Sequence, residues 1–385
     1  MKTFKLVKVI LGAAFSCFLL GSNQQALGQD GTWETKAPMP EGRIQSAGAT
    51  VGGLFYVFGG SDGNGASTIP EVYDPVANTW SFRAADSIAR SMMSAEVINN
   101  KVYVVGGWVG SDSSSPTSAL TFYDPATDSW TNATPMSNAR GGTASGVING
   151  KLYVTGGMGR GTWYSQTAIY DPLSNSWTSG APLPLPVYAA GAVVINGKLY
   201  VLGGILVNHS GHTPALQIYD PASNSWTTGA SMPTSRYSSK AAALNGKLYA
   251  VAGGNNSGAL STVEIYDPVS NTWTLGTPEP SARNLGVSCV INSKLYVAGG
   301  YNASGMIGAT LDVFTPPPGL SLQMYAGLTI MAPVGSTNQI QYVNDVSNTN
   351  WITLTNLVLP SNPYIFIDYG SPGQPRRFYR DVLSP

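Results

Sequence analysis

The stretch Ile195-Asn196-Gly197-Lys198-Leu199-Tyr200-Val201-Leu202-Gly203-Gly204 is the unit from which most of this chain is built. It reads as the end of one strand, a two-residue Asn-Gly turn that accepts the positive φ of a tight hairpin, and a second strand that ends at paired glycines. Such glycine pairs recur at a period of about 48 residues, which is typical of solenoids and propellers. The six pairs are Gly59-Gly60, Gly106-Gly107, Gly156-Gly157, Gly203-Gly204, Gly253-Gly254 and Gly299-Gly300.

Two aromatic residues follow each glycine pair at a constant distance. A third strand ends in Tyr-Asp-Pro, and a fourth strand opens with Trp seven residues after that Tyr. The pairs are Tyr73/Trp80, Tyr123/Trp130, Tyr170/Trp177, Tyr219/Trp226 and Tyr266/Trp273. A fixed turn between the two strands explains the constant spacing, and we expect both rings to pack between neighbouring sheets.

Paired glycines, then Tyr, then Trp at these distances resemble the Kelch repeat, and the resemblance covers residues 31 to about 315. It implies an all-β fold: a six-bladed β-propeller of four-stranded antiparallel blades around a central channel. The sixth unit, which ends at Leu311-Asp312-Val313-Phe314, has no Trp after it, whereas Trp33 has no glycine pair before it. We therefore expect Gly31 to Ala37 to supply the outer strand of the sixth blade and close the ring.

The N-terminus has the pattern of a secretory signal. Lysines precede the apolar run from Val9 to Leu20, and the small residues of Ala26-Leu27-Gly28 follow. The run is about 12 residues long, whereas a membrane-spanning helix needs about 20. We predict that residues 1–28 are removed and that the protein is secreted, periplasmic or at the cell surface; a membrane anchor and a lipoprotein modified at Cys17 are the alternatives.

The C-terminal part is a different module. After the propeller, assigned to residues 29–315, a proline-rich linker at 316–319 leads to residues 320–385, where we expect five to seven short strands in a small β-sandwich-like module. It resembles a short module at the ends of secreted bacterial proteins. Surface attachment, glycan binding and a structural cap are its possible roles, and we interpret the whole chain as a Kelch-repeat protein of the secreted bacterial type.

Composition narrows the possible partners. The chain has 20 Lys and Arg and 20 Asp and Glu, so no global charge attracts nucleic acid. After signal removal Cys289 is the single cysteine, which excludes an internal disulfide, and no transmembrane segment is left. No phosphate-cradling loop and no cysteine spacing typical of a metal site is present. We expect a monomer without a cofactor.

Five of the six units place an arginine at the start of the innermost strand, and Val187 occupies the position in the remaining unit. The arginines are Arg43, Arg90, Arg140, Arg236 and Arg283. Guanidinium groups that converge near a channel mouth could hold an anionic ligand, and the resemblance implies the same, because some Kelch proteins bind acidic peptides through arginines at about this position. The alternative is an architectural role. Lysines that repeat after the hairpin turns on the opposite face are predicted to be solvated.

Residues that break the repeat are candidates for a particular task. They lie in the variable loops that connect the second strand to the third: Trp108, Arg160, Trp163, Tyr164, His209, His212 and Tyr301. Aromatic side chains at loop tips stack on sugars and on peptides, and ordinary loop packing is the alternative reading. The two histidines lack a third ligand nearby in sequence, so we predict no metal site.

These observations favour a binding protein that recognises an extracellular glycan or polypeptide, anionic ones included, on the variable-loop face. One alternative is a sugar-active enzyme of the sialic acid mutarotase type, and another is a structural cell-surface protein. An enzyme needs a positioned acid or base. Loop carboxylates exist, but nothing in the sequence singles one out as catalytic; they are Glu41, Asp62, Asp86, Asp112 and Glu279.

Overall fold

The computed structural model describes residues 31–110 and 115–317 and, beyond them, five strands. The predicted signal at 1–28 and part of the predicted linker lie outside the described residues. The chain divides into a unit from Ala26 to Pro318 and a second unit that contains Gly319–Pro385, and each is described by itself.

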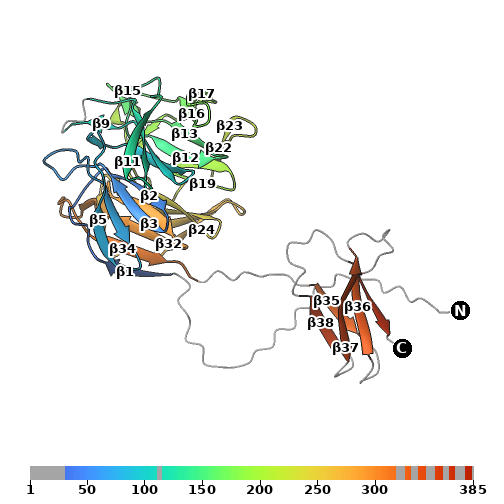
Figure 1. Ribbon diagram of the computed structural model, residues 1–385. Coiled ribbons are helices and arrows are strands. Elements are labelled where there is room, and N and C mark those ends of the chain that lie inside the picture. The colour runs from blue at the N-terminus through green and yellow to red at the C-terminus, as the bar shows by residue number, and fades with distance from the viewer. Residues whose placement is uncertain are drawn as a thin grey trace. The chain divides into compact units, whose positions relative to one another are not determined.

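Six four-stranded antiparallel sheets form the first unit, as predicted (Figure 1), and residues of their innermost strands line a central channel. Each blade is given from its innermost to its outermost strand. The first blade comprises β2 (Ala47–Val51), β3 (Leu54–Phe58), β4 (Glu71–Asp74) and β5 (Thr79–Phe82); the second, β7 (Ser94–Ile98), β8 (Lys101–Val105), β10 (Leu120–Asp124) and β11 (Ser129–Ala133); the third, β12 (Ala144–Ile148), β13 (Lys151–Thr155), β16 (Thr167–Asp171) and β17 (Ser176–Gly180).

The other three blades repeat this order. The fourth comprises β19 (Gly191–Ile195), β20 (Lys198–Leu202), β22 (Leu216–Asp220) and β23 (Ser225–Gly229); the fifth, β24 (Lys240–Leu244), β25 (Lys247–Val251), β28 (Val263–Asp267) and β29 (Thr272–Gly276); the sixth, β31 (Val287–Ile291), β32 (Lys294–Ala298), β34 (Leu311–Thr315) and β1 (Thr32–Lys36). The sixth blade therefore takes its outer strand from the N-terminal end of the unit.

This closure confirms the prediction for Gly31 to Ala37. Strand β1 pairs antiparallel with β34 over five residue pairs, from Thr32 opposite Thr315 to Lys36 opposite Leu311. The ring of Trp33 packs against that of Phe314 in a tilted arrangement with centroids 5.1 Å apart, and its Nε1 donates to the carbonyl of Thr277 at 3.0 Å. The N-terminal strand thus supplies the tryptophan that the sixth repeat lacks.

The repeated tyrosines and tryptophans pack as the spacing predicts. Tyr219 lies directly opposite Trp226, and their ring centroids are 5.1 Å apart. The Tyr219 hydroxyl donates to Asn224 at 2.6 Å, and Trp226 Nε1 donates to the carbonyl of Ala181 in the segment that enters the same blade. The same contacts recur at the other four pairs, so one turn geometry is used five times.

The paired glycines allow neighbouring blades to approach closely. Gly59 has a φ of 53°, and a Cβ there would lie 2.4 Å from the carbonyl oxygen of Arg90 in the next blade. Gly60 N donates to that same oxygen at 2.8 Å. Side chains at these positions would separate the blades, which explains why glycine recurs there.

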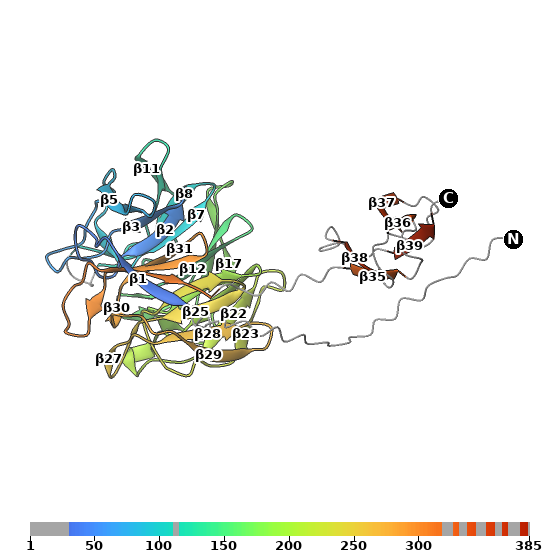
Figure 2. The same ribbon diagram turned by 90° about the horizontal axis from the view of Figure 1, so that it is seen from below.

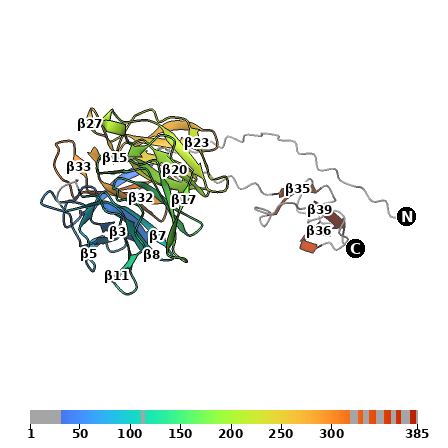
Figure 3. The ribbon, with the colours of Figure 1, turned by 90° about the horizontal axis from the view of Figure 1, so that it is seen from above.

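Short paired segments extend the blades on the face that carries the variable loops. They are β6 (Arg90–Ser91) with β9 (Trp108–Val109), β14 (Met158–Gly159) with β15 (Thr162–Trp163), β18 (Val187–Tyr188) with β21 (Ile205–Leu206), β26 (Gly254–Asn255) with β27 (Gly258–Ala259), and β30 (Arg283–Asn284) with β33 (Tyr301–Asn302). A 3₁₀ turn, η1 (Val207–His209), follows β21. In Figures 2 and 3, β27 lies toward one end of the propeller and the outer strand β23 toward the other.

The described residues of the second unit include five strands. Strand β35 (Ala326–Ile330) pairs with β38 (Tyr364–Asp368), and β36 (Thr337–Val343) lies between β37 (Ile352–Val358) and β39 (Phe378–Leu383). The sandwich-like packing of these two small sheets stays a prediction. Within the described part of the whole chain, no helix is long and apolar enough to cross a membrane.

Candidate functional site on the loop face and in the channel

The five repeated arginines are buried at the start of the blades, with side chains that are 0–2% exposed. Arg236 shows the arrangement: its guanidinium group donates to the carbonyls of Ala252 and Thr262 at 3.0 and 3.1 Å and lies 3.0 Å from Glu264 Oε2. The Arg236 side chain therefore links the end of the second strand to the start of the third strand within its own blade.

Buried or half-exposed carboxylates balance most of these charges. Arg43 contacts Glu71 and Glu41, both at 2.8 Å, and Arg90 contacts Asp86 at 2.6 Å. In the sixth blade the guanidinium of Arg283 contacts Glu279 at 2.7 Å and also Asp312. The burial and these partners favour the architectural alternative over an anion-binding ring. They also engage Glu41, Asp86 and Glu279, three of the loop carboxylates that an enzyme could have used.

The third and fourth blades depart from this arrangement. Arg140 has no carboxylate partner among the described residues; it donates to the carbonyls of Gln166 and Val154 at 3.1 and 3.4 Å, and the ring of Tyr164 lies 5.4 Å from the guanidinium carbon. Burial lowers the pKa of Arg140 to about 10. In the fourth blade Val187 replaces the arginine, and the amide of buried Gln217 bonds the backbone instead. Side chains in the variable loops of these two blades are therefore better candidates for ligand binding than the repeated arginines.

In the structure, two of the predicted loop residues contact each other, and a third contacts an aromatic residue of the next blade. Trp163 on β15 meets His209 of the next blade edge to face, with ring centroids 5.1 Å apart. Beyond it, His212 packs against Tyr237 at 5.6 Å and accepts a hydrogen bond from Asn256 N at 3.1 Å. Both contacts join a loop of one blade to an element of the next.

Other predicted residues have different surroundings. Trp108 is only 2% exposed and packs where a Cβ of Gly141 would stand, so its contacts are ordinary packing between blades. Tyr301 is half-buried in the sixth blade, and Arg160 is exposed at a φ of 48° at the tip of the loop before Trp163. The arrangement that results is an aromatic arc over the third to fifth blades, formed by Trp163, Tyr164, Tyr188, His209, His212 and Tyr237.

The aromatic arc has no acidic side chain in the segments around it. Residues 134–143, 156–167, 181–190, 203–215, 230–239 and 253–262 contain neither Asp nor Glu. The same segments contain Arg160 and Arg140, which lacks a carboxylate partner among the described residues, so their formal charge is positive. No group of three His, Cys, Asp or Glu side chains able to hold a metal ion occurs in the described residues.

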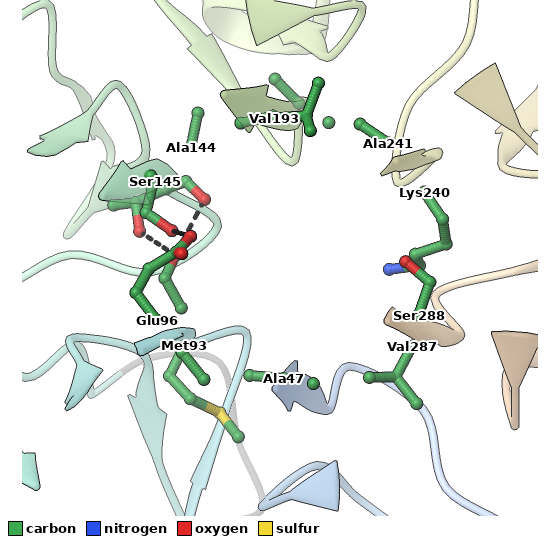
Figure 4. A pocket seen from close by; sticks show the side chains of 18 of the residues that line it. Ala47, Met93, Glu96, Ala144, Ser145, Val193, Lys240, Ala241, Val287 and Ser288 are labelled. Carbon is green, nitrogen blue, oxygen red and sulfur yellow. Dashed lines mark hydrogen bonds between the residues drawn. The ribbon is translucent and has the colours of Figure 1, made fainter. Parts of the chain in front are cut away.

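Two charged residues of the central channel were missed at the sequence level. Glu96 on β7 and Lys240 on β24 line a cavity of about 380 Å³ and face each other from opposite sides of the ring (Figure 4). A signal was available, because these are the only charged residues in the six innermost strands. Neither residue occupies a position whose residue type recurs in the other units.

Two Kelch family models match the propeller. The model of the KLHDC2/KLHL20/DRC7 Kelch-repeats domain matches residues 92–300, and that of the Kelch motif matches residues 42–84. The chain belongs to the Kelch-repeat family. Kelch-like protein 35 of Mus musculus is 34% identical over 77 residues, which make up 20% of this chain and 13% of that protein. Spermatocyte protein spe-26 of Caenorhabditis elegans is 36% identical over 77 residues, 18% of this chain and 14% of that protein.

A solved structure shows the same fold. The structure of YjhT matches with a TM-score of 0.64 and 20% sequence identity, over 72% of this chain and 95% of that chain. At this identity the likeness concerns the Kelch propeller alone. The matched segment is a small fraction of both curated relatives, so their activities and partners do not carry over to this chain.

Proposed function

We propose that this Kelch propeller is an exported binding protein that recognises a polypeptide or glycan through the aromatic arc on its variable-loop face. A Kelch propeller supports a protein-interaction role. The observation that carries the finer proposal is the aromatic arc itself. Its rings come from three consecutive blades and are half-buried except for exposed His209, and in two of these blades the repeated arginine–carboxylate pair is incomplete.

The chemistry of the aromatic arc suits an extended ligand. Half-buried Trp and Tyr rings are held in place by packing and still offer a face or an edge for contact, and such residues dominate binding energies at interfaces. The surrounding loops lack carboxylates, so an acidic or neutral partner meets no repulsion there. Exposed Arg160 can pair with an anionic group at the rim.

The experiment is a screen of the mature protein against oligosaccharide and peptide arrays at low and moderate salt. We expect Trp163→Ala to weaken binding of the strongest ligand by about tenfold or more, the size of a modest hot spot. Phe82→Ala is the matched control, because Phe82 is a 52% exposed aromatic side chain on the outer strand of the first blade. Arg160→Gln should reduce the salt dependence if the ligand is anionic.

The same screen tests the alternatives. Saturable binding that persists in Trp163→Ala would move the site off the aromatic arc. Turnover of a bound sugar would favour an enzyme of the sialic acid mutarotase type, and absence of any binding would favour a structural surface protein. Export is tested separately by the N-terminal sequence of the protein recovered from its natural host, which we expect to begin near residue 29.

A further inference from the structure

The central channel is a polar cavity that is separate from the aromatic arc. Its volume of about 380 Å³ lies in the range of ligand pockets. Small residues of the innermost strands keep it open, and Glu96 and Lys240 are the only charged residues among those that line it. Hydroxyl groups from all but one of the blades complete the lining: Ser46, Ser94, Thr143, Ser145, Ser239 and Ser288.

Glu96 has one partner in the channel wall. Ser145 of the next blade donates a hydrogen bond to its carboxylate at 2.7 Å. Burial raises the pKa of Glu96 to about 7, and the Ser145 bond opposes that rise only in part. No arginine or lysine pairs with this carboxylate among the described residues. The wall of the second blade therefore holds a carboxylate that still lacks a cation.

Lys240 is the counterpart on the fifth blade. Its side chain lies beside Ser288, across the channel from Glu96 (Figure 4). Burial lowers the pKa of Lys240 to about 8, and within the described residues its ammonium group has no ion-pair partner. A charge that is partly removed from bulk water costs free energy unless an opposite charge reaches it.

We propose that the channel binds a small extended zwitterion of the short-peptide class, with its ammonium group at Glu96 and its carboxylate at Lys240. Such a ligand neutralises both walls at once, whereas a simple anion or a simple cation would leave one charge unpaired. The hydroxyl groups of the lining can bond the polar groups between the two charged ends.

The register of the strands sets the shape of this ligand. Glu96 is the third residue of β7 and Lys240 the first of β24, strands that start at the same point of the repeat. The two positions thus differ by two residues, about 6 to 7 Å along a strand, in addition to their separation across the channel. A single α-amino acid carries its charges on neighbouring carbons, which is too close; short peptides and ω-amino acids carry them farther apart.

The channel wall is rigid enough to hold both groups in place. Just before the lining residues, backbone hydrogen bonds link neighbouring blades: Gln45 N to Leu285 O at 2.7 Å, Met92 N to Gln45 O at 2.8 Å, Gly142 N to Met92 O at 2.7 Å, Ala189 N to Gly142 O at 2.8 Å, and Ser238 N to Ala189 O at 2.7 Å. Side chains on strands fixed in this way keep their geometry without a ligand.

The test is calorimetric titration of the full chain with glycine, γ-aminobutyrate, ε-aminocaproate and a glycine tripeptide, and with butylamine and butyrate as singly charged controls. We expect binding of the longer zwitterions only. Glu96→Gln and Lys240→Gln should each weaken it by about tenfold or more. Lys247→Gln, which removes a lysine from the next strand of the same blade but outside the channel, should leave it unchanged.

The pH profile gives a second readout. Glu96 is ionised above its pKa of about 7 and Lys240 is protonated below its pKa of about 8, so affinity should peak between these values. The residual affinity of Glu96→Gln should lose the acidic limb, and that of Lys240→Gln the alkaline limb. These charges face only each other and uncharged residues across the lining strands.

Failure to bind any zwitterion would overturn the proposal, and so would equal binding by butyrate or by the two channel variants. Lys240→Met replaces Lys240→Gln if the latter does not fold. Trp163→Ala should leave channel binding unchanged, so the channel and the aromatic arc can fail independently.

Discussion

Two sets of cations repeat along this propeller in equally strict register, and they differ in almost everything else. The arginines at the start of the innermost strands are 0–2% exposed; all of them bond backbone carbonyls, and all except Arg140 also contact carboxylates. The lysines after the hairpin turns are at least partly exposed, and four of them pair with the aspartate of the neighbouring Tyr-Asp-Pro turn at 2.9–3.3 Å: Lys101, Lys151, Lys198 and Lys247.

The comparison shows that a residue type that recurs at one position of the repeat has a structural role. Its recurrence does not show how much it contributes to the free energy of unfolding. A buried guanidinium without its carboxylate is costly, whereas an exposed ammonium loses little without its partner. Function is better sought where the register is broken, as at Arg140 and Val187 on the loop face and at Glu96 and Lys240 in the channel.

The largest effect is expected from removing the strand that closes the ring, because the carboxylate partner of one repeated arginine lies beside that strand. Asp312, the partner of Arg283, lies on β34 under the closing strand, where Thr35 bonds its carboxylate at 2.6 Å. A protein that begins after Pro40 loses β1, including the partial burial of Trp33, which is worth at most about 2 to 3 kcal/mol. We expect a lower melting temperature and aggregation, measured by scanning calorimetry and size-exclusion chromatography against a protein that begins at Gln29. A truncated protein that stays monomeric and equally heat-stable would disprove this account of closure.

The next effect concerns one buried pair. Arg236→Val should lower the free energy of unfolding by about 3 to 5 kcal/mol, because Glu264 is left buried without its cation. Urea denaturation measures this value. A loss below about 1 kcal/mol, the usual limit for an exposed pair, would mean that the buried arginines contribute no more than the exposed lysines.

The fourth blade supplies a compensating change. It combines Val187 with Gln217 where the fifth combines Arg236 with Glu264, and both solutions fold. Arg236→Val together with Glu264→Gln should therefore recover most of the stability lost in the single variant, since an apolar or neutral replacement of a buried ion pair is often tolerated. If the double variant is as unstable as Arg236→Val alone, contacts other than the charge pair hold this blade together.

A smaller, pH-dependent effect is expected for Glu96. Its pKa in the folded protein, about 7, lies above its ordinary 4.5, so the folded form retains a proton that the unfolded chain has lost. Stability relative to Glu96→Gln should therefore be highest below pH 4.5 and fall until pH reaches about 7. Unfolding curves of both proteins across this range give the difference. Glu34→Gln serves as a control of opposite sign, because Lys36 lowers the pKa of exposed Glu34.

Most of the fold could be predicted because each blade repeats the same local information. The Tyr219 and Trp226 spacing depends on one turn, and the glycine pairs mark close backbone approach. The closing strand could be predicted because the sixth repeat has no Trp after its third strand, whereas Trp33 has no glycine pair before it. These are properties of residues near one another in the sequence or of the repeat itself.

The sites were harder to predict because their partners are distant in sequence. Arg236 meets Glu264 from the third strand of its blade, and nothing in the local sequence shows that the guanidinium is buried. Trp163 meets His209 only because consecutive blades place their loops side by side. Glu96 and Lys240 face each other only after the ring has closed, which no single repeat encodes.

The smallest effect is expected for the exposed lysines and completes the comparison. Lys247 lies 3.3 Å from Asp267, and its side chain is 47% exposed, so solvent and salt weaken the attraction. Lys247→Gln should change the free energy of unfolding by no more than about 0.5 to 1 kcal/mol, and by less at high salt. Urea denaturation at two salt concentrations measures both quantities, with Arg236→Val as the buried counterpart in the same blade. A loss as large as that of Arg236→Val would show that position in the repeat, and not burial, determines how much a recurring cation stabilises this propeller.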